Sequence, residues 1–528
     1  MRIVLSLYSD IPNNTTLLDT TYRLPNFYEA LVKSLSKYND VLLLINNDLI
    51  QYQHVSNEAL DPYVAEQYGK CIEAFNPELI IAVNNSFCSD FKYKFDCPYL
   101  IWTVDSVKYL VGYPNIECNE NTYVLIPAEK MANDAKEIGF KPKKIIYSLS
   151  PTGVYAQNLP FLHDISFIGS VFTNGILDPI EKKIKKRNKE ELDMVISSYE
   201  NDRRTKFTDR VSNELLKDIN YIKSTDAFVK QYFDQIDMFC LNHISQRFRE
   251  DILSECANFN LGLYGTKNWI SQKEQIKKAY IKGFFYTTQH NQDIYNSSKL
   301  NFNICHKQAI GGFSWRITDV MASNGLLVSD SSIEKTWNNL YPSIKIPFYT
   351  NKNEIYGICK KYLKEENLRK DLVSQCQEKV NLNHRFENLF EIISDSMNIR
   401  LMNYNDETKT YSPQQIDNFD IIIKRKYSFL ASSMKKTLIA ATYIFRLIID
   451  TVAVRVPKFF KFLRSFKFLR SVVKQIELIL RYKENLSFNS PISLLHIYKT
   501  DKKTNKIFTM GKYLNRYVFK KNNGNKKQ

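Results

Sequence analysis

The residues best suited to chemistry lie in the run Arg-Ile-Thr-Asp-Val-Met-Ala-Ser-Asn-Gly-Leu-Leu-Val-Ser-Asp from Arg316 to Asp330. This pattern predicts a helix that ends near Gly325, then a buried strand and a polar loop. Arg316 and Asp319 are three residues apart and would share one face near the helix start. The carboxylate could accept both hydroxyls of a ribose, and the guanidinium with the helix N-terminal amides suits a diphosphate. The alternative is a solvated Arg–Asp pair on a surface helix.

Other chemical signatures are absent from the sequence. It contains no G-x-x-x-x-G-K-[ST], G-x-G-x-x-G, H-E-x-x-H, G-x-S-x-G or D-x-D motif. The seven histidines show no metal-ligand spacing, and the nine cysteines are scattered without a C-x-x-C pair. We therefore expect no metal, no redox cofactor and no disulfide framework, but reduced thiols in a cytoplasmic protein.

The composition supports large folded domains. The chain has 528 residues, 44% of them apolar and 24% charged, which excludes a collagenous or wholly disordered protein and suggests about three domains. Short apolar runs without alternation, typical of parallel strands covered on both faces, alternate with helix-length segments such as 22–38. They predict strands at 3–8, 41–45, 79–83, 99–104, 123–126 and 145–149.

A second series of strands is predicted at 164–170, 261–265, 281–286, 300–304, 326–328 and 344–349. The charged stretch 176–259 is too long for a structureless loop, so we expect a helical insert there. The predicted fold is α/β, with two doubly wound, Rossmann-like domains facing a cleft. The first domain would span 1–155. The second would span 156–399, including the insert and a closing helix around 383–399.

The remainder of the chain changes character. Residues 400–423 are polar and turn-rich and predict a linker. The tail 424–528 carries 25 Lys/Arg against four acidic residues, whereas the net charge of the whole chain is +17. The body is therefore nearly neutral, and the basic excess belongs to a tail that we expect to be mainly helical. The start of the chain reaches Asp10 after too short an apolar run for a signal peptide.

Five short motifs follow one another along the body: I-S-F-I-G-S at 165–170, L-Y-G at 263–265, K-L-N-F-N-I-C-H at 299–306, R-x-x-D-x-x-A-x-x-G at 316–325 and N-H-R-F-E-N at 383–388. Together they resemble the CgeB-like glycosyltransferases, which are built on the two-Rossmann GT-B fold. Upstream, residues 76–84 and 100–105 look like the N-terminal domain that often precedes that domain. The resemblance covers about residues 1–395.

The resemblance implies transfer of a sugar from a nucleotide-sugar donor, held by the C-terminal domain, to an acceptor held by the N-terminal domain. The acceptor would be a glycan, a lipid-linked molecule or a protein at the cell envelope. Asp319 falls where the wider fold group places a Glu on the ribose, and Arg316 and Lys299 are candidate diphosphate cations. The full set of candidate donor-binding residues is Gly169, Ser170, Tyr264, Gly265, Lys299, Asn303, Arg316 and Asp319.

Gly311 departs from the family pattern, because many retaining members carry an acid eight residues before the ribose acid. Retention and inversion of the anomeric centre therefore both stay open. Inversion needs a general base, and the first candidate is Asp105, which ends a strand of the first domain and would face the cleft. Its alternative role is a capping or turn residue. His306 is the second candidate, and its alternative is a hydrogen-bonded structural histidine.

Two other functions compete with glycosyl transfer. The basic tail contains interleaved aromatic residues and would suit nucleic-acid binding, although it lacks a recognisable reading module. Gly311 is also compatible with a catalytically inactive protein that only binds a sugar nucleotide. Transfer or hydrolysis of a donor, as against binding alone, separates this second alternative from an enzyme.

The tail contains one apolar stripe at helical spacing, formed by Phe462, Phe466, Leu469, Val473, Ile476 and Leu480. Residues 424–483 carry 15 Lys/Arg against two acids, and their longest uncharged apolar run, 437–445, is nine residues. A bilayer span needs about 20. We therefore predict that this segment lies on the inner face of an anionic membrane. A helix packed on the body, or a coiled-coil seam, is the alternative.

Truncation after Tyr404 should therefore give a protein that binds donor but no longer sediments with anionic liposomes. The physical reason is the loss of both the apolar stripe and its basic flanks. Full-length protein that fails to sediment at low salt would contradict the prediction. A change of oligomeric state on truncation would instead support the coiled coil.

Overall fold

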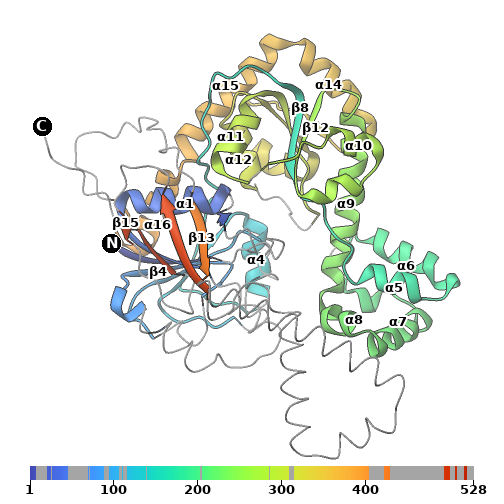
Figure 1. Ribbon diagram of the computed structural model, residues 1–528, viewed down its shortest axis with the longest axis horizontal. Coiled ribbons are helices and arrows are strands. Elements are labelled where there is room, and N and C mark those ends of the chain that lie inside the picture. Colours follow the sequence, from blue (N-terminus) through green and yellow to red (C-terminus); the bar gives the residue numbers. More distant parts are fainter. Residues whose placement is uncertain are drawn as a thin grey trace, which may run out of the picture.

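The chain forms two α/β domains, with a smaller helical lobe extending from the second (Figure 1). The computed structural model describes residues 1–7, 21–24, 26–45, 69, 72–87, 94–105, 110, 116–137, 139–202, 205–284, 286–307, 314–402, 421–427, 493–499, 506–507 and 516–519. Each domain is built around one mainly parallel sheet. This confirms the predicted fold class.

The first sheet has the described strand order β15-β16-β3-β1-β4-β5-β6-β7. Its parallel part comprises β1 (Arg2–Leu7), β3 (Asp40–Ile45), β4 (Leu79–Val83), β5 (Tyr99–Trp102), β6 (Thr122–Ile126) and β7 (Lys144–Tyr147). Alternate side chains enter different cores, so that Leu79, Ile81 and Val83 pack with α1 (Asn26–Tyr38), while Ile80 and Ala82 pack on the side of α4 (Glu129–Glu137). Burial on both faces explains the uninterrupted apolar runs of the sequence.

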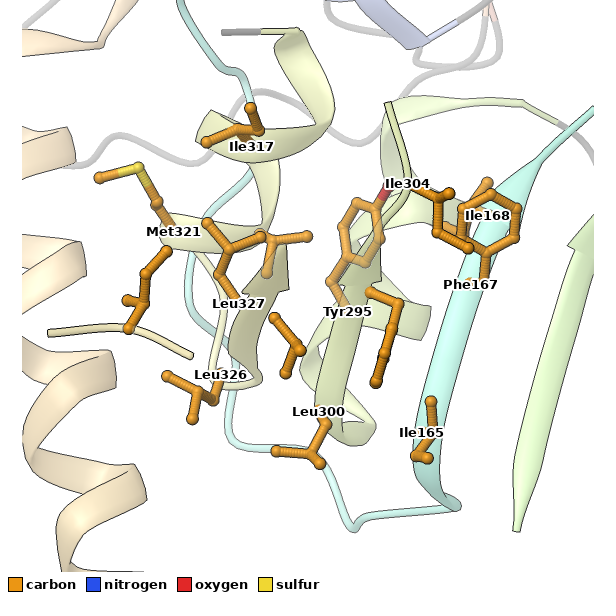
Figure 2. Close-up of a cluster of buried hydrophobic side chains, with 14 of the residues drawn as sticks. Ile165, Phe167, Ile168, Tyr295, Leu300, Ile304, Ile317, Met321, Leu326 and Leu327 are labelled. Atoms are coloured by element: carbon orange, nitrogen blue, oxygen red, sulfur yellow. The ribbon is translucent and has the colours of Figure 1, made fainter. Parts of the chain in front are cut away.

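The second sheet has the order β12-β11-β10-β8-β9. Its strands are β8 (His163–Gly169), β9 (Leu261–Gly265), β10 (Ser298–Asn303), β11 (Leu326–Asp330) and β12 (Phe348–Tyr349), and all are parallel. Figure 2 shows apolar side chains of β8, β10 and β11 in one hydrophobic cluster with Ile317 and Met321 of α12 (Trp315–Met321). The remaining helices of this domain are α10 (Glu274–Ala279), α11 (Thr288–Asn296), α13 (Glu334–Leu340), α14 (Ile355–Lys364) and α15 (Glu366–Asn383).

One predicted strand is reduced to a single contact. The sequence predicts a strand at 281–286, but the described residues there form only an isolated bridge between Leu263 and Tyr280. Gly283 adopts a positive φ of 84° immediately afterwards. That backbone conformation turns the chain away from β9 and ends the pairing.

The helical lobe occupies the stretch in which we expect an insert. It consists of α5 (Leu177–Lys183), α6 (Lys186–Ser198), α7 (Asn213–Thr225), α8 (Ala227–Tyr232) and the first part of α9 (Ile236–Cys256), with a hydrophobic core of its own. The second part of α9 leaves this lobe, because Ile252, Leu253 and Cys256 pack into the core of the second sheet. The long helix α9 therefore joins the lobe to the domain (Figure 1).

The closing helix belongs to the other domain. This helix is predicted to close the second domain, 156–399. In the structure, the apolar side chains of α16 (Phe386–Met397) pack into the core of the first domain. Phe386, Phe390 and Ile393 are nearly fully buried there. The chain therefore crosses between the domains twice, and the two crossings meet where Thr152 forms a bridge with Arg385.

The described parts of the tail differ from the mainly helical structure predicted for 424–528. They are the strands β13 (Ile421–Tyr427), β14 (Ser493–Lys499), β15 (Lys506–Ile507) and β16 (Arg516–Phe519). β13 begins inside the predicted linker and pairs with β14 and with β2 (Thr21–Arg23), whereas β16 pairs with β3. The unpaired backbone groups of an edge strand favour such pairing over a helix. The apolar stripe from Phe462 to Leu480 lies outside the described residues.

No helix in the described part of the chain is both long enough and apolar enough to cross a membrane.

The first two turns of α1 form the main contact between the domains. The Phe27 ring stacks on Trp315 of α12 with 4.8 Å between the centroids. Glu29 accepts a hydrogen bond of 2.9 Å from the backbone N–H of Thr288, the first residue of α11. A carboxylate at a helix N-terminus is favourable because it meets unpaired N–H groups and the positive end of the helix dipole.

Asp319 is buried at this interface, with 2% of its surface exposed. Its Oδ2 accepts a 2.6 Å hydrogen bond from Asn26 Nδ2, and its Oδ1 accepts one of 2.5 Å from the hydroxyl of Thr152. One carboxyl group thus ties α12 to α1 and to the first interdomain crossing. Burial raises the pKa of this carboxyl to about 7, although both hydrogen bonds and the charges of Arg316 and Arg385 oppose the increase.

The raised pKa predicts how the Asp319→Asn variant changes the pH dependence of stability. The folded protein binds the Asp319 proton more tightly than the unfolded chain, so ionisation costs stability as the pH rises from about 4 to about 7. The neutral amide avoids this cost, which amounts to at most about 4 kcal/mol. As the pH rises across this range, the thermal midpoint of Asp319→Asn should therefore increase relative to that of the wild type.

The control is Asp319→Ala, which leaves Asn26 and Thr152 without their acceptor at every pH. Its midpoint should lie below that of the wild type throughout, by an amount equivalent to about 1–3 kcal/mol for each unpaired group. Parallel curves for the wild type and Asp319→Asn would show that the carboxyl titrates normally.

Candidate functional site

The carboxyl ends of β8, β9 and β10 lie at one edge of the second sheet. Gly169 ends β8 and Ser170 follows it, Gly265 ends β9, and Asn303 ends β10. Gly265 has a φ of 140°, and a Cβ there would collide with the backbone oxygen of Gly169. The close approach of the two strand ends therefore requires glycine at 265.

Arg316 reaches this edge from the first turn of α12. Its Nε donates a 3.1 Å hydrogen bond to the carbonyl of Ile168, and its Nη1 lies 3.3 Å from the side-chain oxygen of Asn303. The guanidinium carbon lies 5.2 Å from the centroid of the Phe167 ring. These contacts bring Arg316 together with the strand ends that carry Gly169 and Asn303.

Arg249 of α9 is a second cation at the same edge. Only 3% of its surface is exposed. Its two terminal nitrogens donate to the carbonyls of Ser170, at 2.5 Å, and Ile304, at 3.2 Å. The guanidinium carbon lies 5.1 Å from the centroid of the Phe167 ring, nearly the same distance as that of Arg316. Both guanidinium groups therefore contact the same aromatic ring, that of Phe167.

Among the described residues, no carboxylate forms a salt bridge with Arg249 or Arg316. The buried Nε of Arg249 has no hydrogen-bond partner there. Burial, and then the nearby charge of Arg316, lowers the pKa of Arg249 to about 9. An anion bound here would supply the missing counter-charge and accept charge-assisted hydrogen bonds. We call Arg249 and Arg316 the arginine pair.

Arg249 is not among the predicted donor-binding residues, because it lies within 176–259, where a helical insert is predicted. A signal was present, since Arg249 shares one face of α9 with Ser245, Ile252, Leu253 and Cys256, all of them buried. Arginine is almost never fully buried without a partner. An arginine within the apolar stripe of a predicted helix therefore indicates a buried cation at position 249.

Asn303 and His306 are held by the surrounding protein. Asn303 is completely buried and donates to Ser329 and to the sulfur of Cys305 while it faces Arg316. A ring nitrogen of His306 lies 2.8 Å from the side-chain oxygen of Asn242, and Phe172 packs edge-on against the ring at 4.5 Å. His306 is therefore in contact with α9 through Asn242 and with Phe172.

Lys299 and Tyr264 do not join the site. Lys299 is the second residue of β10 and forms an ion pair of 2.8 Å with Asp164, the second residue of β8. Lys299 and Asp164 are therefore at the amino edge of the sheet, and about 13 Å of strand separates Lys299 from Asn303. Parallel strands place their two ends on opposite edges, which separates Lys299 from the predicted set. Tyr264 pairs with Ile168 near the carboxyl end of β9, but its hydroxyl lies 2.7 Å from the ring of His163, the first residue of β8.

The carboxyl group of Asp319, for which a ribose contact is predicted, is hydrogen-bonded by the protein. Both carboxyl oxygens of Asp319 accept hydrogen bonds across the domain interface. Arg316 instead contacts Ile168 and Asn303 at the carboxyl edge of the second sheet. The two residues are one helical turn apart but point to different parts of the structure. Gly311 lies outside the described residues.

Asp105 follows β5 at the carboxyl edge of the first sheet. Its Oδ2 accepts a 2.8 Å hydrogen bond from Asn84 Nδ2, which follows β4. Burial raises the pKa of the Asp105 carboxyl, and the Asn84 amide partly opposes the increase. A carboxylate with a raised pKa is a stronger base, which suits removal of a proton from a hydroxyl group.

The described residues contain no group of three or more His, Cys, Asp or Glu side chains able to hold a metal ion.

Solved structures of glycosyltransferases are similar to the chain at low identity. HepE from Anabaena, in complex with UDP and glucose, has 10% identity and a TM-score of 0.39, covering 75% of this chain and 99% of its own. Sucrose-phosphate synthase from Thermosynechococcus elongatus has 10% identity and a TM-score of 0.39, covering 75% of this chain and 97% of its own. The DNA-modifying enzyme β-glucosyltransferase has 11% identity and a TM-score of 0.37, covering 76% of this chain and 100% of its own.

No curated protein matches the sequence. A protein family does, over part of the chain: residues 245–394 match the family described as glycosyl transferase-like. The matched part includes Arg249, Gly265, Asn303 and Arg316, and the CgeB-like subtype stays a prediction. Residues 245–394 are therefore similar to a glycosyl transferase-like domain.

Proposed function

We propose that the protein transfers a sugar from a nucleoside-diphosphate sugar to a hydroxyl group of an acceptor. The observation that carries this proposal is the arginine pair at the carboxyl edge of the second sheet. Arg249 is buried and Arg316 is half-buried, and among the described residues neither forms a salt bridge with a carboxylate. The carboxyl edge is where doubly wound domains bind their ligands. The match of residues 245–394 to a glycosyl transferase-like family supports the same chemistry.

In this proposal the arginine pair binds the diphosphate and stabilises it as a leaving group. When the bond between the anomeric carbon and the diphosphate oxygen breaks, negative charge develops on the diphosphate. Two guanidiniums fixed by backbone carbonyls need little reorganisation to stabilise that charge. They would supply the positive charge that a metal ion supplies in other transferases, in keeping with the absence of D-x-D from the sequence.

On the acceptor side, Asp105 would take the proton of the attacking hydroxyl. The carboxyl lies at the carboxyl edge of the first sheet, and its raised pKa strengthens it as a base. This role belongs to an inverting reaction. The hydrogen bond of His306 with Asn242 occupies one of its ring nitrogens, which supports Asp105 as the first candidate for the base.

We also propose that the acceptor is a glycan, a lipid-linked molecule or a protein at the cell envelope. Residues 424–483 would hold the enzyme on the membrane surface through their basic and apolar faces. This part of the proposal rests on the stripe from Phe462 to Leu480 and on the local net charge. A hexose is the proposed sugar.

Arg316→Met should weaken binding of the cognate nucleoside diphosphate by about 10- to 100-fold, because a charge-assisted hydrogen bond is worth about 1.5–3 kcal/mol. Binding can be measured by calorimetry after a thermal-shift panel of UDP, GDP, ADP and their sugars has identified the base. Arg249→Met should weaken binding similarly.

The matched control is Arg369→Met. Arg369 is also buried, with 4% of its surface exposed, and it also donates to a backbone carbonyl, that of Tyr362. It lies on α15, outside the arginine pair. The control should lower stability but leave the affinity unchanged. Equal affinities for the wild type and Arg316→Met would disprove the diphosphate site.

Asp105→Asn should leave donor affinity unchanged and lower turnover by about 10²-fold or more, since the amide cannot accept the hydroxyl proton. Turnover is measured as release of nucleoside diphosphate from the donor selected by the panel. If turnover persists in Asp105→Asn but falls in His306→Gln, the base is His306 and not Asp105. Donor binding without any turnover of the wild-type protein would favour a sugar-nucleotide-binding protein.

A further inference from the structure

The point at which the first sheet reverses its strand order carries a polar cluster. The chain runs from β1 to its neighbour β3 and then returns to β4 on the other side of β1. The carboxyl ends of β1 and β4 diverge into connections on opposite sides, and such switch points form the ligand crevice of doubly wound sheets. Asn84, Asn85 and Ser86 follow β4 here, and Asp105 follows the adjacent strand β5.

Asn84 makes three hydrogen bonds to the segment that carries Asp105. Its backbone N–H donates to the carbonyl of Trp102 at 2.8 Å. Its side-chain oxygen accepts from the backbone N–H of Val104 at 2.9 Å, and its side-chain nitrogen donates to Asp105 Oδ2 at 2.8 Å. One residue therefore fixes both the backbone before Asp105 and the carboxyl group itself.

The backbone conformation explains why asparagine stands at this position. Asn84 has a φ of 51° and Asn85 a φ of 58°. Asparagine tolerates this left-handed region better than other side-chain-bearing residues, and glycine tolerates it without strain. The two neighbours share the conformation but differ in contacts, because the side-chain oxygen of Asn85 accepts a hydrogen bond from the hydroxyl of Tyr99 at 3.0 Å.

We propose that Asn84 is the positioning residue for the acceptor-side base, holding Oδ2 of Asp105 so that Oδ1 takes the proton of the acceptor hydroxyl. This inference rests on the proposed function. In the described part of the chain no hydrogen bond is recorded at Oδ1. In the reaction the hydroxyl proton passes to Oδ1, and the acceptor oxygen bonds to the anomeric carbon. The diphosphate leaves with the electron pair of its bond.

Asn84 also favours the ionised state that the base requires. Burial raises the pKa of Asp105, and the hydrogen bond from Asn84 is the influence that lowers it. Among the described residues no charged side chain contributes to this pKa. Removal of the Asn84 amide should therefore leave burial unopposed, so that Asp105 needs a higher pH to ionise.

The experiment compares Asn84→Gly with Asn85→Gly. Both changes remove a buried side chain at a positive φ that glycine adopts freely, so their effects on the backbone are matched. The pH profile of turnover is measured with the donor selected by the panel, as nucleoside diphosphate release. The acid limb should shift upward by about one pH unit in Asn84→Gly and stay at the wild-type pH in Asn85→Gly.

A second readout needs no acceptor. The thermal midpoint of each variant is measured from pH 4 to pH 8. The midpoint of Asn84→Gly should fall relative to that of Asn85→Gly as the pH rises, because a further raised pKa in the folded state makes ionisation more costly. When Asp105→Asn is added to both variants, the difference between their midpoints should no longer depend on pH. The pH dependence that comes from Asp319 is the same in both variants and cancels in the comparison. Asn84→Asp, which retains the size of the side chain but replaces the donor with an acid, should shift the limb further.

The outcomes separate the two proposals. If Asp105→Asn lowers turnover but Asn84→Gly and Asn84→Asp keep the wild-type pH profile, Asn84 is a structural turn residue and the positioning role is wrong. If Asp105→Asn keeps full turnover, the assignment of the base fails. In that case a pH-dependent midpoint difference between Asn84→Gly and Asn85→Gly would still show that Asn84 controls the ionisation of Asp105.

Discussion

A single carboxyl group, that of Asp319, connects the parts of the protein that must act together. It is buried between the domains and accepts hydrogen bonds from Asn26 of α1 and from Thr152 of the first crossing. Because α12 also carries Arg316, the same helix that docks the domains places a cation at the edge of the second sheet. The stacking of Phe27 on Trp315 and the contact of Glu29 with Thr288 extend this interface. The position of the arginine pair relative to the first domain therefore depends on the interface around α12.

The arginine pair shows how a site can be prepared for an anion before the anion arrives. Burial of a guanidinium costs free energy unless its hydrogen bonds are satisfied. Arg249 donates to the backbone carbonyls of Ser170 and Ile304, and Arg316 donates to that of Ile168. The carbonyls fix the geometry but leave the net charge in place, so that the field at the strand edge favours a negative ligand. The helical lobe contributes to this edge through α9, which carries Arg249 out of the insert and into the sheet.

The two sheets use the same property of parallel strands for different purposes. In the second sheet the carboxyl edge gathers cations and small residues, which suits a diphosphate. In the first sheet it gathers Asn84 and Asp105, a half-buried carboxyl and the amide that holds it. Under the proposed function, the two edges would provide the two elements that glycosyl transfer needs, a stabilised leaving group and a base for the incoming hydroxyl.

The sequence by itself determined the parallel strands of the two sheets, because strands buried on both faces must be apolar throughout. It did not predict the tail strands β15 and β16, which join the first sheet at its edge. It also placed Gly169, Ser170, Gly265, Asn303 and Arg316 near strand ends, which became one edge once the strands paired in parallel. Only the tertiary structure decided which charges face each other. Lys299 pairs with Asp164 at the opposite edge, Asp319 turns to the domain interface, and α16 returns to the first domain. Arg249 enters the site from a helix about 80 residues beyond Gly169 in the chain. These outcomes depend on contacts between residues far apart in the sequence, and spacing along the chain carries no information on such contacts.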